Sequence, residues 1–185
     1  MELIDAIQNR KSIRSYKNTE ISNEIIEDLI NCARLAPSAK NRQPWKFVVI
    51  KNEMKSKIIE LMLEKEKNPD SKFDTKFYPT SVPSTVKAIE QAPILILVLR
   101  EPDDNWRIGD ALSIGAAVEH ICLRATNLGL GSLWIRDTVY AEEEILKLIS
   151  QENMNLVCAI SIGYPNENKN PRPRKTLEEI LMWYK

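Results

Sequence analysis

Residues 94–99 constrain this fold most, because they form an unbroken apolar run, Ile-Leu-Ile-Leu-Val-Leu. A strand with one face in solvent alternates apolar and polar residues. This run does not alternate, so it predicts a strand buried on both faces. It is far too short to cross a lipid bilayer. The chain therefore needs covering layers on both sides of a central sheet.

Three more strands are predicted, at residues 46–50, 131–135 and 156–162. They are few and lie far apart in the sequence, so strands that follow one another cannot form tight hairpins. A chain of 185 residues with no repeat and no clear linker suits one domain, residues 1–185. The pattern predicts an α+β fold in which helices sandwich a small sheet.

Helices are predicted where apolar residues recur at helical spacing. Ser22 can cap one helix, and Thr176 begins a capping box with Glu179. The longest helix has Ala, Gly and Leu almost all round, which predicts that it is largely buried. The predicted helices are residues 2–10, one after Ser22, a charged one after residue 50, residues 110–128, a surface helix at 142–149, and a short one from Thr176.

Residues 65–83 are polar, contain three prolines and show no clean period. They predict a surface excursion or lid. A disordered insert without function is the alternative.

Charge and cysteine content exclude several classes. The chain has 26 Lys plus Arg and 26 Asp plus Glu, so no global field attracts nucleic acid or an anionic membrane. The three cysteines are far apart, which is typical of reduced, mostly buried thiols in a cytoplasmic protein. The N-terminus is acidic and amphipathic, unlike a signal peptide.

The sequence lacks the motifs of several enzyme classes. It has no Gly-rich dinucleotide or P-loop motif, no nucleophile elbow and no cluster of metal ligands. The single histidine, His120, falls in the long predicted helix and is expected to be a satisfied core or interface residue. Hydrolysis by side chains alone is therefore disfavoured, and a bound cofactor would have to supply the chemistry.

Two basic clusters could bind a phosphate ester. Arg10, Lys11, Ser12 and Arg14 lie within five residues, and Arg172, Arg174 and Lys175 lie within four, next to Pro171 and Pro173. Guanidinium forks and a hydroxyl give a phosphate monoester both charge and directed donors. Either cluster taken alone could instead be a solvated basic turn.

The segment 37–45 reads as a loop. Ser38, Asn41 and Gln43 offer groups that suit the edge of a heteroaromatic ring with both donors and acceptors. A plain polar connection is the alternative.

Four segments together resemble the motifs of the nitroreductase family. They are residues 10–16, 36–47, 128–135, and 162–165 followed by 171–175. They occur in the family's order and cover nearly the whole chain. The resemblance implies a nitroreductase-like fold with a small mixed sheet, in an intertwined homodimer that binds FMN between its subunits. It further implies reduction of an acceptor by NADH or NADPH in a ping-pong cycle, with the flavin rather than a side chain as the catalyst.

The resemblance also assigns residues to the flavin. Arg10, Ser12, Arg172 and Arg174 would hold the phosphate, Lys11 would lie beside the ribityl chain, and Arg14 near the pyrimidine edge. Pro37, Ser38, Ala39 and Asn41 would come from the partner subunit, with Gln43 close by. Backbone groups of Trp134, Ile135 and Arg136 would face the reactive edge of the ring.

Some features depart from the family's pattern or leave alternatives open. Ala39 replaces a frequent serine and Lys40 adds a charge, while Ser84 and Lys87 could form a second set of flavin contacts. The tail, residues 181–185, is apolar and aromatic and is expected to pack across the partner. The alternatives are a tail folded on its own subunit, a protein that only binds or senses flavin, and a flavin-consuming or dehalogenating branch of the family.

Overall fold

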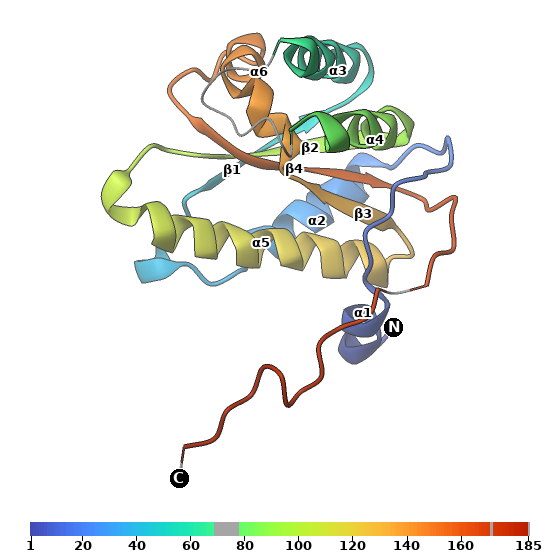
Figure 1. Ribbon diagram of the computed structural model, residues 1–185, viewed down its shortest axis with the longest axis vertical. Coiled ribbons are helices and arrows are strands. Elements are labelled where there is room, and N and C mark those ends of the chain that lie inside the picture. Colours follow the sequence, from blue (N-terminus) through green and yellow to red (C-terminus); the bar gives the residue numbers. More distant parts are fainter. Residues whose placement is uncertain (69–77, 171, 185) are drawn as a thin grey trace.

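The computed structural model describes residues 1–68, 78–170 and 172–184 (Figure 1). Three parts of the preceding predictions lie outside the described residues. These are segment 69–77 of the polar excursion, Pro171 of the second basic cluster, and Lys185 of the tail.

Four strands form one sheet in the order β1-β2-β4-β3, with antiparallel pairing between all neighbours. They are β1 (Trp45–Ile50), β2 (Ile94–Arg100), β3 (Gly131–Ile135) and β4 (Asn155–Gly163). The prediction of a mixed sheet was wrong for these four strands, because all three pairings are antiparallel. β2 and β3 do run in the same direction, but β4 lies between them. The one parallel pairing involving a described strand is an isolated bridge from Ser12 to Ser132 of β3.

Helices cover both faces of the sheet (Figure 1). The elements are α2 (Asn23–Arg34) and α5 (Arg107–Asn127) on one face, and α3 (Asn52–Lys67), α4 (Tyr78–Gln91) and α6 (Glu142–Leu148) on the other. All seven residues of β2 are buried, and its side chains alternate between the two resulting cores. The predicted two-sided burial of residues 94–99 is therefore confirmed.

Short elements complete the fold. α1 (Leu3–Asn9) stands off beside the C-terminal end of α5, and η1 (Ala39–Asn41) lies at the N-terminal end of α5 (Figure 1). The other two are η2 (Asp104–Trp106) and η3 (Asp137–Ala141). Ser22 caps α2 as predicted, because its Oγ accepts a hydrogen bond from the backbone N–H of Ile25.

Segment 65–83 was predicted to be a surface excursion or lid because it shows no clean period, but both of its described ends are helical. α3 continues to Lys67, and α4 begins at Tyr78 and contains Pro83. Val82, Val86 and Ile89 are all buried at helical spacing, so packing outweighs the break expected from proline.

The predicted burial of the longest helix holds on one face only. α5 begins at Arg107, three residues earlier than expected. Ile108 and Leu112 are each 72% exposed, although the opposite face of α5 packs on the sheet. An apolar face of the longest helix therefore lies open on the isolated subunit.

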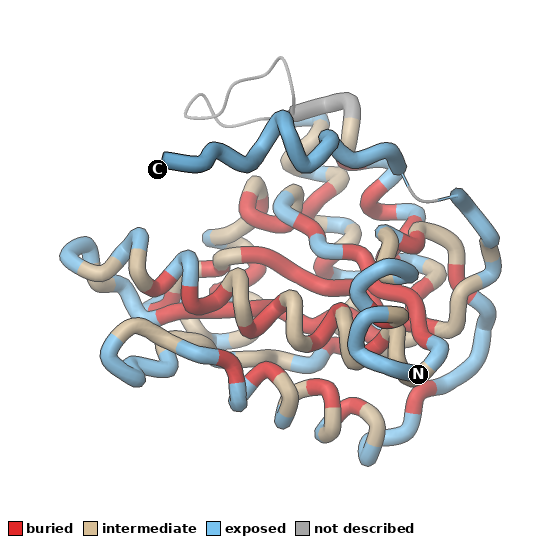
Figure 2. Tube along the Cα trace, turned by 90° about the horizontal axis from the view of Figure 1, so that it is seen from below, coloured by how far each residue is buried: buried red, intermediate tan, exposed pale blue. Residues whose placement is uncertain are grey.

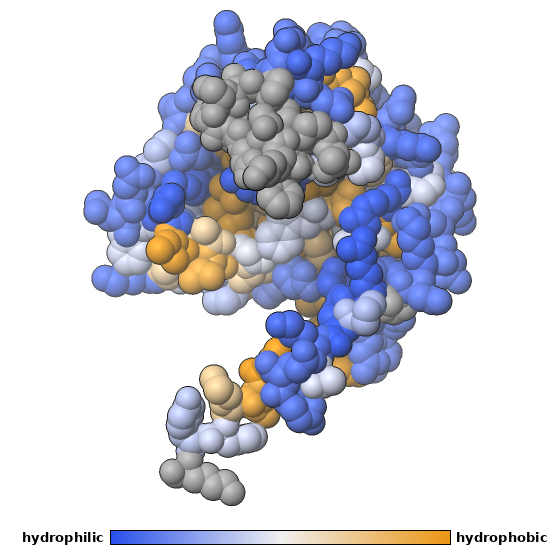
Figure 3. Space-filling model, in the orientation of Figure 1, coloured by the Kyte–Doolittle hydropathy of each residue, from blue (hydrophilic) through white to orange (hydrophobic). Residues whose placement is uncertain are grey.

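The C-terminal tail forms no helix, contrary to the capping-box prediction. Glu179 accepts a hydrogen bond from the N–H of Thr176, but only a single turn follows. The tail leaves the body and is exposed along its length, with apolar side chains on its surface (Figures 1, 2 and 3). Trp183 is 80% and Tyr184 90% exposed. The tail is thus not folded on its own subunit.

Candidate phosphate and cofactor site

The two basic clusters meet in one cavity of about 580 Å³. Segment 10–14 and segment 169–174 approach each other there, and the N-terminal half of α4 closes a further side. The lining residues are Arg10, Lys11, Ser12, Arg14, Ser81, Ser84, Lys169, Asn170, Arg172 and Arg174. The structure thus brings six of the seven residues of the two predicted clusters together, and only Lys175 does not line the cavity.

The segment after α1 lies against β3 because Gly131 has no side chain. Ile13 is buried there and donates its backbone N–H to the carbonyl of Ser132, at 2.9 Å. A Cβ on Gly131 would lie only 2.7 Å from Cβ of Ile13. Close backbone approach therefore places Ser12 and Arg14 on either side of a buried anchor.

Tyr16 provides a second anchor, on β4. Its hydroxyl donates to the carbonyl of Ile13 at 2.7 Å and lies 3.0 Å from Oγ of Ser161. Its ring packs on Gly163, where a Cβ would lie 2.7 Å from a ring carbon. Burial raises the pKa of the Tyr16 hydroxyl, so the group stays neutral and keeps its donor role.

Hydrogen bonds tie segment 10–16 to the segment that follows β4. Glu167 accepts the backbone N–H of Arg14 at 2.7 Å, and Nζ of Lys11 donates to the carbonyl of Lys169 at 2.7 Å. Partial burial of Glu167 opposes its ionisation, but hydrogen bonds from Lys169 and Arg14 lower its pKa overall. These contacts direct the chain onward to Arg172 and Arg174.

The cavity has an excess of positive charge. Six of its lining residues are cationic and none is a carboxylate. Arg10 is paired with Glu119 at 3.1 Å, and Lys169 with Glu167 at 2.7 Å. Within the described residues, the Arg14 and Arg172 guanidinium groups make no hydrogen bond or ion pair. Free guanidinium forks beside the Ser12, Ser81 and Ser84 hydroxyls fit a dianionic phosphate ester.

The loop predicted to contact a ring lies elsewhere in the subunit. Residues 38–43 surround η1 at the N-terminal end of α5, whereas segment 10–14, which lines the cavity, lies near the other end (Figure 1). A helix of 21 residues is about 30 Å long. The cavity is lined by none of the predicted loop residues, which are Pro37, Ser38, Ala39, Asn41 and Gln43. One chain therefore does not join the loop to the phosphate cluster.

Strand β3 forms an open sheet edge beside the cavity. Ser132 directs its carbonyl outward to Ile13, and by alternation the backbone groups of Trp134 also face outward. Ile135 is buried, so its side chain cannot contact a ligand. Trp134 is 45% exposed, and Arg136 Nη1 donates to the carbonyl of Val157 at 3.0 Å.

Several cavity residues were missed by the sequence analysis. Ser81, Lys169 and Asn170 belong to no motif and reach the cavity only through tertiary folding. Ser84 was considered together with Lys87, yet only Ser84 lines the cavity. Ser81 and Ser84 are three residues apart, which on a helix is a shared face.

The cysteines and the single histidine agree with their predictions. Cys32, Cys122 and Cys158 are free thiols. Nδ1 of His120 lies 3.1 Å from the carbonyl of Cys32. No group of metal ligands occurs in the described part of the chain, nor does any helix there that is long and apolar enough to span a membrane.

An α+β fold with a cationic cavity beside an open sheet edge is typical of proteins that bind a phosphorylated cofactor. The model of the nitroreductase family matches residues 7–164, and the chain belongs to that family of oxidoreductases.

Known proteins are similar to nearly the whole length of this chain. A protein of Archaeoglobus fulgidus named "Putative NADH dehydrogenase/NAD(P)H nitroreductase" is 33% identical over 175 residues, covering 91% of this chain and 88% of its own. Iodotyrosine deiodinase of Hydra vulgaris is 29% identical over 188 residues, covering 94% of this chain and 69% of its own. The crystal structure of a BluB-like flavoprotein from Clostridium difficile 630 is 30% identical, with a TM-score of 0.82 and full coverage of both chains.

Proposed function

We propose that this chain is an FMN-dependent oxidoreductase that takes hydride from NADH or NADPH and reduces a small acceptor. The observation that carries the proposal is the cavity with six cations, because it fits the single phosphate ester by which FMN differs from riboflavin. The similar C. difficile protein is a flavoprotein, and the similar A. fulgidus protein is named for NAD(P)H.

The proposed phosphate ligands are Arg10, Ser12, Arg172 and Arg174. Their support is the shared cavity, the free guanidinium of Arg172 and the Gly131 contact that fixes Ser12. Lys11 would lie beside the ribityl chain, where its Nζ already bonds the carbonyl of Lys169.

FMN held by these residues would supply the redox chemistry, which is hydride transfer from the nicotinamide and reduction of the acceptor. Arg14 would lie near the pyrimidine edge of the ring. Its guanidinium makes no hydrogen bond or ion pair with the described residues, so it is available to stabilise negative charge on the reduced ring. The outward backbone groups of Trp134, with those of Ile135 and Arg136, would contact the ring at the open edge of β3.

A homodimer would complete the site. The loop residues Pro37, Ser38, Ala39, Asn41 and Gln43 would then contact the flavin held by the other subunit. The separation of loop and cavity along α5 supports this arrangement, because one subunit does not unite them. The open apolar face of α5 and the projecting tail supply surfaces for a second copy. The three free thiols suit a reducing compartment, so we expect the protein in the cytoplasm.

The acceptor would be a nitroaromatic, a quinone or an activated alkene. Reductive dehalogenation of a halogenated phenol is a second candidate, because the deiodinase of Hydra is similar over 94% of this chain. Turnover of iodotyrosine, in preference to nitroaromatics and quinones, would favour the second candidate.

The test is the visible absorption spectrum of the purified protein, recorded before and after anaerobic addition of NADH or NADPH. A flavin spectrum that bleaches with either nicotinamide is expected. A protein that neither contains flavin nor binds added FMN would contradict the proposal. Bound flavin that no nicotinamide reduces would indicate a flavin-binding protein without turnover.

A further inference from the structure

The loop after α2 has an unusual backbone. Lys40, Asn41 and Gln43 have φ angles of 50°, 57° and 49°, in the left-handed region that side chains disfavour. None of them is glycine, so each of these conformations is strained and has to be stabilised by surrounding contacts. The contacts that hold this loop therefore determine where Ser38, Asn41 and Gln43 lie.

Arg42 connects the loop to α5. Its Nε lies 3.1 Å from Oδ1 of Asp110, and its Nη2 lies 2.9 Å from Oδ2 of Asp103. Its guanidinium also stacks over the ring of Trp106, 4.7 Å from the ring centre. Arg42 is thus held from three directions, while neighbouring residues keep left-handed conformations.

Asp110 is the buried centre of these contacts. It is only 1% exposed, and Arg100 Nη1 approaches its Oδ2 to 3.8 Å from β2. A second contact lies one turn further along α5, where Ser113 Oγ accepts the N–H of Ala39 at 3.1 Å. Both contacts fix the loop to the first turns of the same helix.

We infer that Asp110 is a positioning residue, which holds residues 38–43 in the shape that contacts the flavin of the second subunit. The inference presupposes the flavin site proposed above. A buried ion pair contributes little to stability, because loss of hydration offsets the attraction. Its geometry is nevertheless specific, since the Arg42 fork can meet Asp110 and Asp103 only in one orientation. The ion pair between Asp110 and Arg42 therefore contributes more to the orientation of the loop than to the stability of the core.

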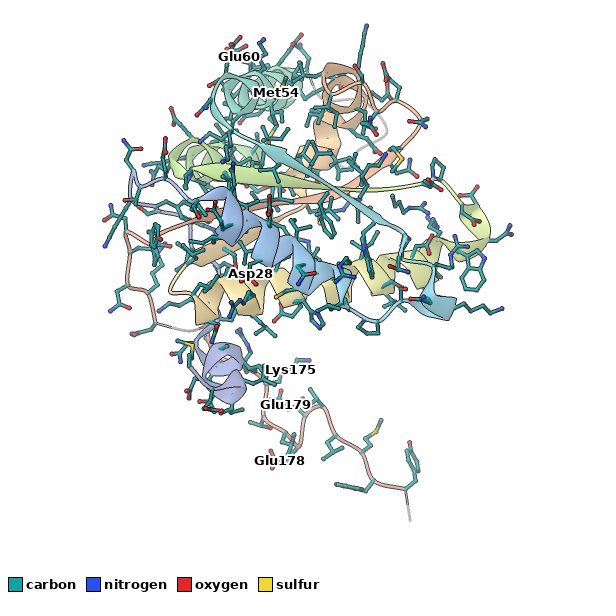
Figure 4. The ribbon with its side chains drawn as sticks, turned by 180° about the vertical axis from the view of Figure 1, so that it is seen from behind. Asp28, Met54, Glu60, Lys175, Glu178 and Glu179 are labelled. Carbon is teal, nitrogen blue, oxygen red and sulfur yellow. The ribbon has the colours of Figure 1, made fainter. Side chains whose placement is uncertain are left out.

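The test compares Asp110→Asn and Arg42→Ala with the wild-type holoprotein. Arg42 has a partly exposed side chain, so its removal keeps the inference testable if Asp110→Asn fails to fold. Asp28→Asn is the matched control, because Asp28 of α2 pairs with Arg124 of α5 at 2.6 Å (Figure 4). It removes a carboxylate that joins another element to the same helix, away from the loop.

Three quantities are measured: the FMN dissociation constant, the flavin absorption maxima at saturating FMN, and tryptic cleavage after Lys40 and Arg42. For Asp110→Asn, a rise of the dissociation constant by at least about tenfold, shifted maxima and faster cleavage after Lys40 are expected. Arg42→Ala should reproduce the first two effects. Asp110→Glu should recover part of the affinity, and Asp28→Asn should keep the wild-type spectrum.

The outcomes separate the two proposals. If the wild-type protein binds no FMN, the proposed function fails and the inference fails with it. If the wild-type protein binds FMN and nicotinamide bleaches it, but both loop variants keep wild-type affinity and spectrum, the inference alone is overturned. Variants that lose thermal stability but retain the wild-type spectrum at saturating FMN would likewise overturn it, since that result indicates a purely structural role.

Discussion

At the scale of single residues, Gly131 and Gly163 determine where segment 10–16 can lie. The segment rests on both positions, through Ile13 and Tyr16. These glycines are needed for close approach, because neither has a positive φ angle. The nearby Gly129 differs, since its φ is 75° and a Cβ there would meet nothing within 4 Å.

Gly131→Ala should therefore weaken FMN binding by about tenfold or more and lower stability by about 1–3 kcal/mol, because the added methyl group displaces Ile13. Fluorescence titration with FMN and thermal unfolding measure the two effects. Gly129→Ala is the control, and its left-handed strain should cost about 1 kcal/mol while FMN affinity stays unchanged. Equal FMN affinity in both variants would show that close approach at Gly131 does not position the site.

The buried thiol of Cys158 should make the stability of the fold depend on pH. Burial raises the pKa of its thiol to about 12, whereas the thiol ionises near pH 9 in an unfolded chain. Because the folded state keeps the thiol proton more tightly than the unfolded state, the fold has its full stability below pH 9. That stability falls as the pH rises toward 12, because the unfolded chain then loses the proton first. The urea midpoint of the wild type should therefore fall more between about pH 8 and pH 10.5 than that of Cys158→Ala. Parallel declines would contradict this.

The site residues show what could be predicted at this scale. Arg10, Ser12, Arg172 and Arg174 were predictable because each belongs to a local motif whose residue types suit a phosphate. Ser81 and Lys169 were not, because nothing in their own surroundings marks them. They enter the cavity only because α4 and the segment after β4 pack beside segment 10–16.

At the scale of elements, the strands were predictable and their pairing was not. The apolar runs place β1, β2, β3 and β4 within one residue of their observed ends, since burial determines those patterns. The position of β4 between β2 and β3 depends on tertiary packing, and no local sequence pattern indicates it. α4 was missed because its prolines suggested a break, whereas its buried face stabilises the helix.

The tail is the element with the clearest testable role. It projects from the body with Met182, Trp183 and Tyr184 each at least 77% exposed, which is unfavourable for a free chain in water (Figure 4). Deletion of residues 176–185 should convert a dimer into a monomer and release FMN. Sedimentation and flavin absorbance would measure this. A truncated protein that remains a flavin-loaded dimer would contradict the expected packing of the tail on the partner subunit.

At the scale of the whole molecule, the proposed site unites the cavity of one subunit with the loop of the other. Mixed dimers of Arg172→Glu and Arg42→Ala test this directly. If the loop serves the partner's cavity, one site carries both defects and the other is intact, so about one flavin per mixed dimer should be recovered. If each loop served its own subunit, both sites would be defective and no flavin would return.

The order in which the chain is made adds a consequence. Arg10 and Arg174 line one cavity although nearly the entire sequence separates them. A ribosome therefore makes the Arg10 side of the proposed phosphate site long before the Arg174 side. A nascent chain that has emerged only as far as β4 can bury both cores but lacks Arg172 and Arg174. If the cavity holds the flavin phosphate as proposed, flavin capture thus has to await synthesis of the segment after β4.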